Sequence, residues 1–145
     1  MNENLELMMS LYKTSEMGVY STTCLINTLR NKENKIKPLL ESEIKEYEKY
    51  KNKSEKILNK KDLELPNNSL MTKMSSNMGI KMEAIMDNSD SAIASMLIEG
   101  FTMGILEAKS KIEKYKGVCD NKYLKIYKDF LKFQEKEIKH LKTFI

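Results

Sequence analysis

The stretch AIASMLIEGFTMGIL, residues 92–106, contains one charged side chain, Glu99, among fifteen residues. A helix that is apolar on nearly all sides is typically buried in the interior of a protein. A lone carboxylate in such surroundings is costly unless it is paired, protonated or bound to a metal ion. The stretch therefore predicts a central helix and marks Glu99 as a candidate functional group.

Helical periodicity continues on both sides of this stretch, because apolar residues recur at alternating steps of three and four. Asn31–Asn34, the linker Lys60–Ser69 with Pro66, and Gly117 interrupt the pattern. With only 2 prolines and 5 glycines in 145 residues, the chain lacks the turn residues of a sheet protein. We predict one all-α domain, residues 1–145, with helices at about 3–30, 35–60, 69–87, 90–116 and 120–144.

The order of these helices predicts a particular connection. If the helix at 69–87 runs along the side of the bundle, it acts as a crossover between the second and third long helices and lets them run parallel. A long crossover between two helical hairpins is how ferritin-like bundles are connected. The expected fold is therefore a four-helix bundle with an extra crossover helix between helices two and three.

Charge and composition narrow the function classes. The net charge is +4, but all except one of the 25 basic residues are lysines, interleaved with acidic residues as on solvated helix faces. Nucleic-acid readers rely more on arginine, so we expect no nucleic-acid partner. The apolar run is too short to span a bilayer and no secretory signal is visible. Cys24 and Cys119 follow no metal or redox spacing, and we expect a soluble cytoplasmic protein.

Carboxylates recur at one depth of the predicted bundle. Glu43 and Glu137 each fall within the apolar stripe of a helix. Counted from the end where the first helix stops, Glu43 and Glu99 lie about nine residues along their helices and Glu137 about eight, within a few ångström of one level. Within the central helix, however, Ala94, Phe101 and Ala108 belong to the more continuous apolar face and Glu99 lies roughly opposite, so its orientation toward the bundle centre or toward an interface stays open. Three interior carboxylates would repel one another unless protons or cations held them together.

The last helix also carries Glu137-x-x-His140, and the second helix carries Glu43-x-x-Glu46 in the equivalent place, while Glu16 lies at the edge of the first helix's buried face. One Glu from each of two helices and Glu-x-x-His from each of the other two is the di-iron carboxylate pattern. The chain thus resembles ferritin-like and rubrerythrin-like bundles, and around MGIKM and EGFTMG it resembles an uncharacterised bacterial branch of them.

The resemblance implies a degenerate di-metal site for iron or manganese, with oxidase or peroxide-scavenging chemistry. Its ligands would be Glu43, Glu99, Glu137 and His140, with Glu16 and Glu46 as lesser candidates. Because Glu46 stands where the second histidine is expected, the preference shifts toward harder, oxygen-ligated metals. The substrate and the catalytic residues are not indicated.

Other interpretations remain open. The buried acids can instead be hydrogen-bonded to Tyr47, Gln134, Thr102 or lysine side chains. A methionine-rich face at residues 70–85 suits an adaptable apolar interface, so the alternative function is a non-catalytic bundle that forms homodimers or larger homo-oligomers or binds a protein partner. Copper or heme binding by these thioethers is a more distant possibility. The residues of this candidate partner face are Met71, Met74, Met78 and Met82.

Overall fold

The computed structural model describes residues 2–61, 63, 65 and 88–145. Within these residues the chain forms four helices and no strands, which confirms the all-α prediction. The predicted bounds of these helices agree within two residues, whereas the crossover helix predicted at 69–87, with Met71, Met74, Met78 and Met82, lies outside the described residues. The helices are α1 (Glu3–Thr28), α2 (Lys37–Asn59), α4 (Asp90–Tyr115) and α5 (Asn121–Lys142).

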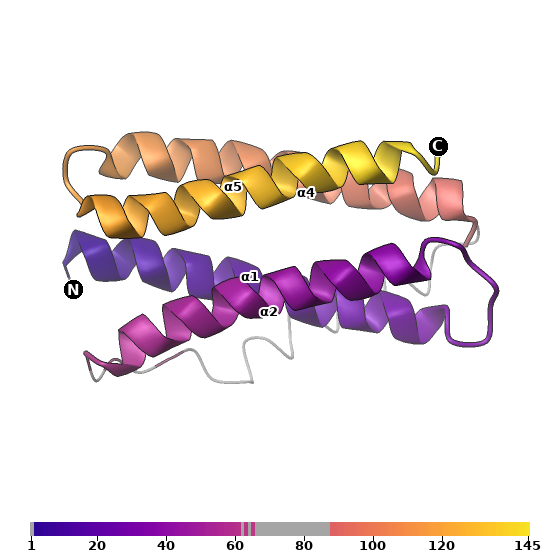
Figure 1. Ribbon diagram of the computed structural model, residues 1–145, viewed down its shortest axis with the longest axis horizontal. Coiled ribbons are helices and arrows are strands. Elements are labelled where there is room, and N and C mark those ends of the chain that lie inside the picture. Colours follow the sequence, from indigo (N-terminus) through magenta and orange to yellow (C-terminus); the bar gives the residue numbers. More distant parts are fainter. Residues whose placement is uncertain (1, 62, 64, 66–87) are drawn as a thin grey trace.

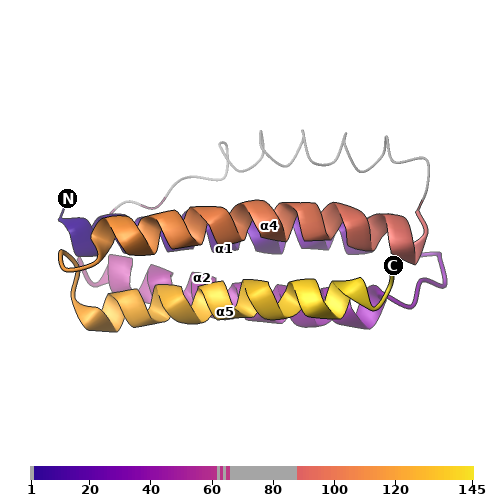
Figure 2. The ribbon, with the colours of Figure 1, turned by 90° about the horizontal axis from the view of Figure 1, so that it is seen from above.

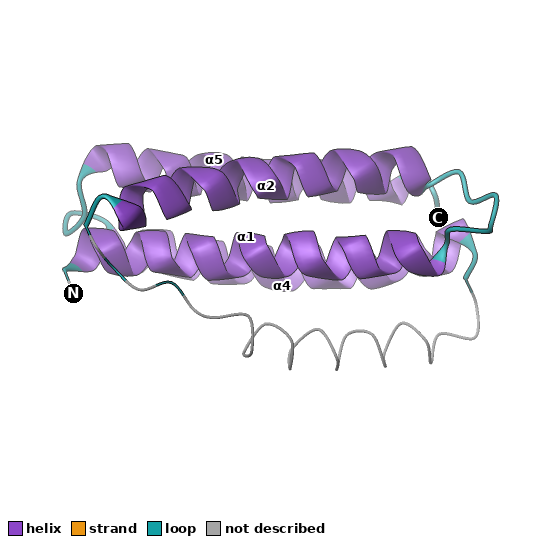
Figure 3. Cartoon of the chain, turned by 90° about the horizontal axis from the view of Figure 1, so that it is seen from below, coloured by secondary structure: helices purple, strands orange, loops and turns teal. Residues whose placement is uncertain are grey.

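The four helices form an elongated bundle made of two antiparallel hairpins. Figure 1 shows α1 paired with α2 and α4 paired with α5, and these two pairs have the most extensive contacts. Figures 2 and 3, turned by 90° from Figure 1, show α1 and α4 together on one side of the bundle and α2 and α5 together on the other. The helices α2 and α4 run in the same direction, as predicted for the second and third long helices.

Polar side chains join the two hairpins at both ends of the bundle. At one end, Asp90 accepts hydrogen bonds from the side chain of Asn34 (2.9 Å) and from the backbone N–H of Lys35 (3.1 Å). At the other end, Asn4 donates to Asp120 (3.1 Å) and accepts from its backbone N–H (2.9 Å). These contacts connect the start of α4 to the α1–α2 loop and the start of α1 to the start of α5, so they hold the hairpins in one register.

The helix ends follow from local sequence. The side chain of Asn2 accepts from the N–H of Leu5 at the start of α1, and Ser89 accepts from Ala92 at the start of α4. Pro38 lies in the first turn of α2, where its missing N–H is not needed. After α4, Gly117 has a φ of 76°, a left-handed conformation that favours glycine.

Aromatic rings fill the middle of the bundle. The ring of Tyr47 stacks on Phe101 at 6.0 Å and meets the edge of Phe133 at 5.2 Å. It lies so close to Gly18 that a Cβ atom there would overlap the ring, so the glycine permits the close approach of α1 and α2. Gly100 of α4 differs, because no atom of the described residues lies within 4 Å of the position its Cβ would take.

The outer face of α4 remains apolar and exposed. Met103 and Leu106 are 69% and 65% exposed. Among the described helices, α4 alone is long and apolar enough to cross a membrane by length and composition, which is weak evidence for a span because core helices meet the same two criteria. In this fold α4 packs against α5 and α1.

Candidate carboxylate site in the bundle interior

Six polar residues are buried on the inner faces of the described helices, and five of them differ in how their oxygens are satisfied. The hydroxyls of Ser15 and Ser54 donate to backbone carbonyls one turn earlier, at 2.7 and 2.8 Å, and are satisfied within their own helices. The oxygens of Glu43, Gln134 and Glu137 are not satisfied in this way. The full set is Ser15, Thr22, Glu43, Ser54, Gln134 and Glu137.

Glu43 is the most enclosed acid of the described residues. Its side chain is completely buried, and neither carboxylate oxygen accepts a hydrogen bond from an N–H group or a hydroxyl. The neighbouring group is the carboxyl of Glu137, which is 5% exposed. The prediction that Glu43 and Glu137 meet inside the bundle is therefore confirmed.

This proximity has a clear electrostatic consequence. Burial raises the pKa of Glu43 well above its ordinary value, and the carboxyl of Glu137 raises it further by a hydrogen bond and by charge repulsion. Two carboxyl groups that share an enclosed site cannot both be ionised without a compensating positive charge. The pair must therefore hold a proton between its oxygens or a cation.

Helix geometry explains why these two residues meet. Glu43 follows Leu40 by one turn and precedes Tyr47 by one turn, so it faces the core with them. Glu137 occupies the same position in α5, one turn after Gln134 and one turn before Leu141. Because α2 and α5 are antiparallel neighbours, the two acids lie opposite each other across this interface.

His140 lies at the rim of the site. Its Nδ1 atom is 3.4 Å from Oε1 of Glu137, and its side chain is 45% exposed. The Glu137-x-x-His140 pair therefore forms as predicted, with the imidazole between the buried acid and solvent. The other oxygen of Glu137, Oε2, is enclosed and accepts no hydrogen bond.

The remaining predicted ligands do not join this pair. Glu99 is exposed on α4, so it is not an interior ligand, and of the two orientations left open for it the structure has the outward one. The rotation of α4 turns Ala94, Phe101 and Ala108 inward and Glu99 outward. Glu46 is also turned to the surface, where it lies 3.8 Å from Lys49.

Glu16 belongs to a different part of the interior. Its carboxylate lies beside the hydroxyl of Tyr12, and Oε2 is enclosed without a donor. Burial raises the pKa of Tyr12 to about 12, with further contributions from the hydrogen bond and charge of Glu16 and from the charge of Glu55. Glu16 is thus half-buried on α1, and the structure does not bring it to Glu43.

The aromatic side chain of Tyr47 lies beside the two acids. Burial raises the pKa of the Tyr47 hydroxyl strongly, and the negative charges of Glu43 and Glu137 raise it further. Tyr47 therefore stays a neutral phenol beside the two acids. Among the described residues, no group of three or more His, Cys, Asp or Glu side chains is arranged to hold a metal ion.

Comparisons with protein-family models, curated proteins and solved structures found no match to this chain. The chemistry of the interior residues is therefore the basis for a functional proposal.

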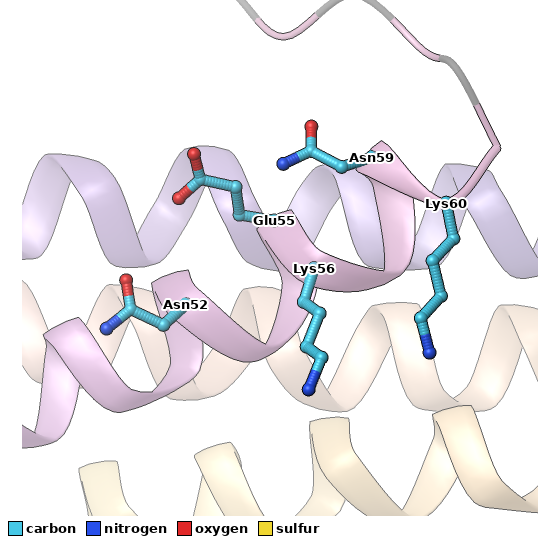
Figure 4. A pocket seen from close by; sticks show the side chains of 5 residues that line it. All are labelled: Asn52, Glu55, Lys56, Asn59 and Lys60. Carbon is cyan, nitrogen blue, oxygen red and sulfur yellow. The ribbon is translucent and has the colours of Figure 1, made fainter.

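A surface pocket of about 420 Å³ lies along the last turns of α2, away from the carboxyl pair. Figure 4 shows its lining side chains, Asn52, Glu55, Lys56, Asn59 and Lys60. Asn52 is nine residues beyond Glu43, or about 13 Å along the helix. The pocket is thus separate from the carboxylate site.

Gln134 is the functional candidate that was not selected from the sequence. It was recognised in the stripe of the last helix only as a possible hydrogen-bond partner of the acids. The available signal was a polar residue within an apolar stripe, one turn before Glu137. Its side chain is 2% exposed, and Oε1 has no hydrogen-bond donor.

Proposed function

We propose that this chain is a ferritin-like helical bundle that binds iron or manganese at the interior carboxyl pair of Glu43 and Glu137, with His140 at the rim. The observation that carries the proposal is the fully enclosed carboxyl of Glu43, whose two oxygens accept no hydrogen bond from an N–H group or a hydroxyl and whose neighbour is a second acid. The parallel course of α2 and α4 supports the ferritin-like connection.

A divalent cation suits this arrangement because it replaces the shared proton and neutralises both carboxylates. Metal binding would then release the proton, so affinity should increase with pH. His140 would supply a nitrogen ligand or hold Glu137 in place from the rim. A bound iron or manganese ion would supply the oxidase or peroxide-scavenging chemistry of this class of site.

Metal titration tests this proposal. At a free Mn²⁺ or Fe²⁺ concentration 100 times the Kd, binding should stabilise the fold by about 2.7 kcal/mol. For a chain of this size that corresponds to an increase in Tm of about 5–10 °C. Glu43→Gln should weaken binding by about tenfold or more, which at the same metal concentration lowers the stabilisation to about 1.4 kcal/mol or less. The measurements are anaerobic thermal unfolding and metal analysis of protein purified without added metal.

Glu99→Gln is the matched control, since it removes one carboxylate charge from the exposed face of α4. It should bind metal as the natural chain does. Trace metal content together with a Tm that ignores both ions would overturn the proposal.

A second candidate function is a non-catalytic bundle that forms homodimers through the outer face of α4. The exposed apolar side chains of Met103 and Leu106 support it, since water-facing apolar residues of this size often mark an interface. Met103→Asp should convert a dimer to a monomer in sedimentation equilibrium, whereas Ser110→Asp, at an exposed polar position of α4, should not. A natural chain that sediments as a monomer at all concentrations would contradict this candidate.

A further inference from the structure

The amide of Gln134 is held inside the bundle without a partner for its oxygen. The side chain is 2% exposed and Oε1 accepts no hydrogen bond, although a buried amide oxygen normally accepts at least one. No other amide side chain is buried in the described part of the chain. Such a group needs an explanation, and a role of the amide oxygen as a ligand supplies one.

Two features set the position of this amide. Gln134 lies one turn before Glu137 on α5, and both residues face the interior. Across the interface, Gly104 of α4 has no side chain, and the space that a Cβ would need is taken by the Nε2 atom of Gln134. Oε1 lies farther from that position, at 4.0 Å, so the nitrogen is directed toward α4 and the oxygen away from it.

We infer that Oε1 of Gln134 is a third interior ligand of the proposed cation site, and that it makes the site selective for a single hard divalent cation such as Mn²⁺. The inference rests on the proposed function. The unsatisfied oxygens of Glu43, Gln134 and Glu137 would then all be ligands of one cation. The interior ligands would all be oxygens, and the one nitrogen would come from His140 at the rim. Carboxylate and amide oxygens suit Mn²⁺ and Mg²⁺, whereas added imidazole favours Zn²⁺.

Among the described residues, acidic, histidine and cysteine side chains alone do not supply three ligands for one ion. The third interior oxygen comes from an amide, a residue type outside that set. It also gives Gly104 a role, because the glycine leaves the space that the amide nitrogen occupies.

The test measures Mn²⁺ and Zn²⁺ affinity of the full chain, with the loss of the electron paramagnetic resonance signal of free Mn²⁺ as the direct readout. Gln134→Leu keeps the volume but removes the ligand oxygen, and should weaken Mn²⁺ binding by about tenfold or more. Gln134→Glu restores an oxygen and should bind Mn²⁺ at least as well as the natural chain. Gln134→His should raise the ratio of Zn²⁺ to Mn²⁺ affinity by about tenfold or more.

The outcomes separate this inference from the function on which it depends. If the natural chain binds no Mn²⁺, both fall. If it binds Mn²⁺, Glu43→Gln abolishes binding and Gln134→Leu binds as tightly as the natural chain, then the inference is overturned while the proposed function stands. Weakened binding in Gln134→Leu with recovery in Gln134→Glu supports the ligand role, since a loss of fold would not be restored by an added charge.

Discussion

The free energy of unfolding of the metal-free protein is expected to fall as the pH rises from about 5 to 8, and Glu43→Gln should remove that fall. An unfolded glutamate has a pKa of about 4.3, and burial beside Glu137 raises the pKa of Glu43 in the folded protein. Between these two pKa values the folded state binds more protons than the unfolded state. Stability from the protonated pair is therefore complete at low pH and is lost as the pH rises toward the folded pKa.

The slope can reach about 1.4 kcal/mol for each pH unit when one proton is involved. Urea unfolding at several pH values, in the presence of a chelator, measures it directly. Glu46→Gln is the matched control, because it removes the same charge from an exposed position of α2 and should leave the slope unchanged. The idea that Glu43 and Glu137 share a proton would be contradicted if the free energy of unfolding of the natural chain, relative to that of Glu43→Gln, stayed constant or rose between pH 5 and 8.

Gly18→Ala is expected to destabilise the bundle by about 1–3 kcal/mol, the usual cost of overpacking a core. Glycine to alanine within a helix ordinarily stabilises by about 0.5–1 kcal/mol, so the predicted effect has the opposite sign. The reason is the ring of Tyr47, which fills the space of the missing side chain and is itself held between Phe101 and Phe133. A rigid ring in that position cannot move aside as a flexible side chain would.

Two further variants make the test specific to this contact. On α4, the added Cβ of Gly100→Ala meets no atom within 4 Å in the described part of the chain, so this variant should stabilise by the ordinary amount. In a Tyr47→Leu background, Gly18→Ala should cost less than it does in the natural chain, because contacting residues are energetically coupled. Urea midpoints at constant m report all of these values. Equal effects of Gly18→Ala and Gly100→Ala would show that the ring does not restrict position 18.

Much of this protein was predictable from local sequence. The helix bounds followed from periodicity and capping residues, and the placement of Glu43 and Glu137 on inner faces followed from the apolar residues one turn away. These features depend on residues three or four apart, and a helix brings such residues together whatever surrounds it. Their common depth followed from the rise of the helix, and the structure confirms that the two acids meet.

The rotation of each helix about its own axis required the tertiary structure. In α4 nearly every side is apolar, so the sequence left open whether Glu99 faces the bundle centre or an interface, and the structure places Glu99 on the exposed face. The sequence also did not distinguish Gly104, which accommodates Gln134, from Gly100, which meets no atom of the described residues within 4 Å. Sequence alone determined which residues are helical and how deep they lie, because both depend on spacing along one chain. Which face of α4 points inward was decided by packing against α5 and α1, because contacts between distant segments select among faces that are all largely apolar. This packing also decided which residues belong to the interior site.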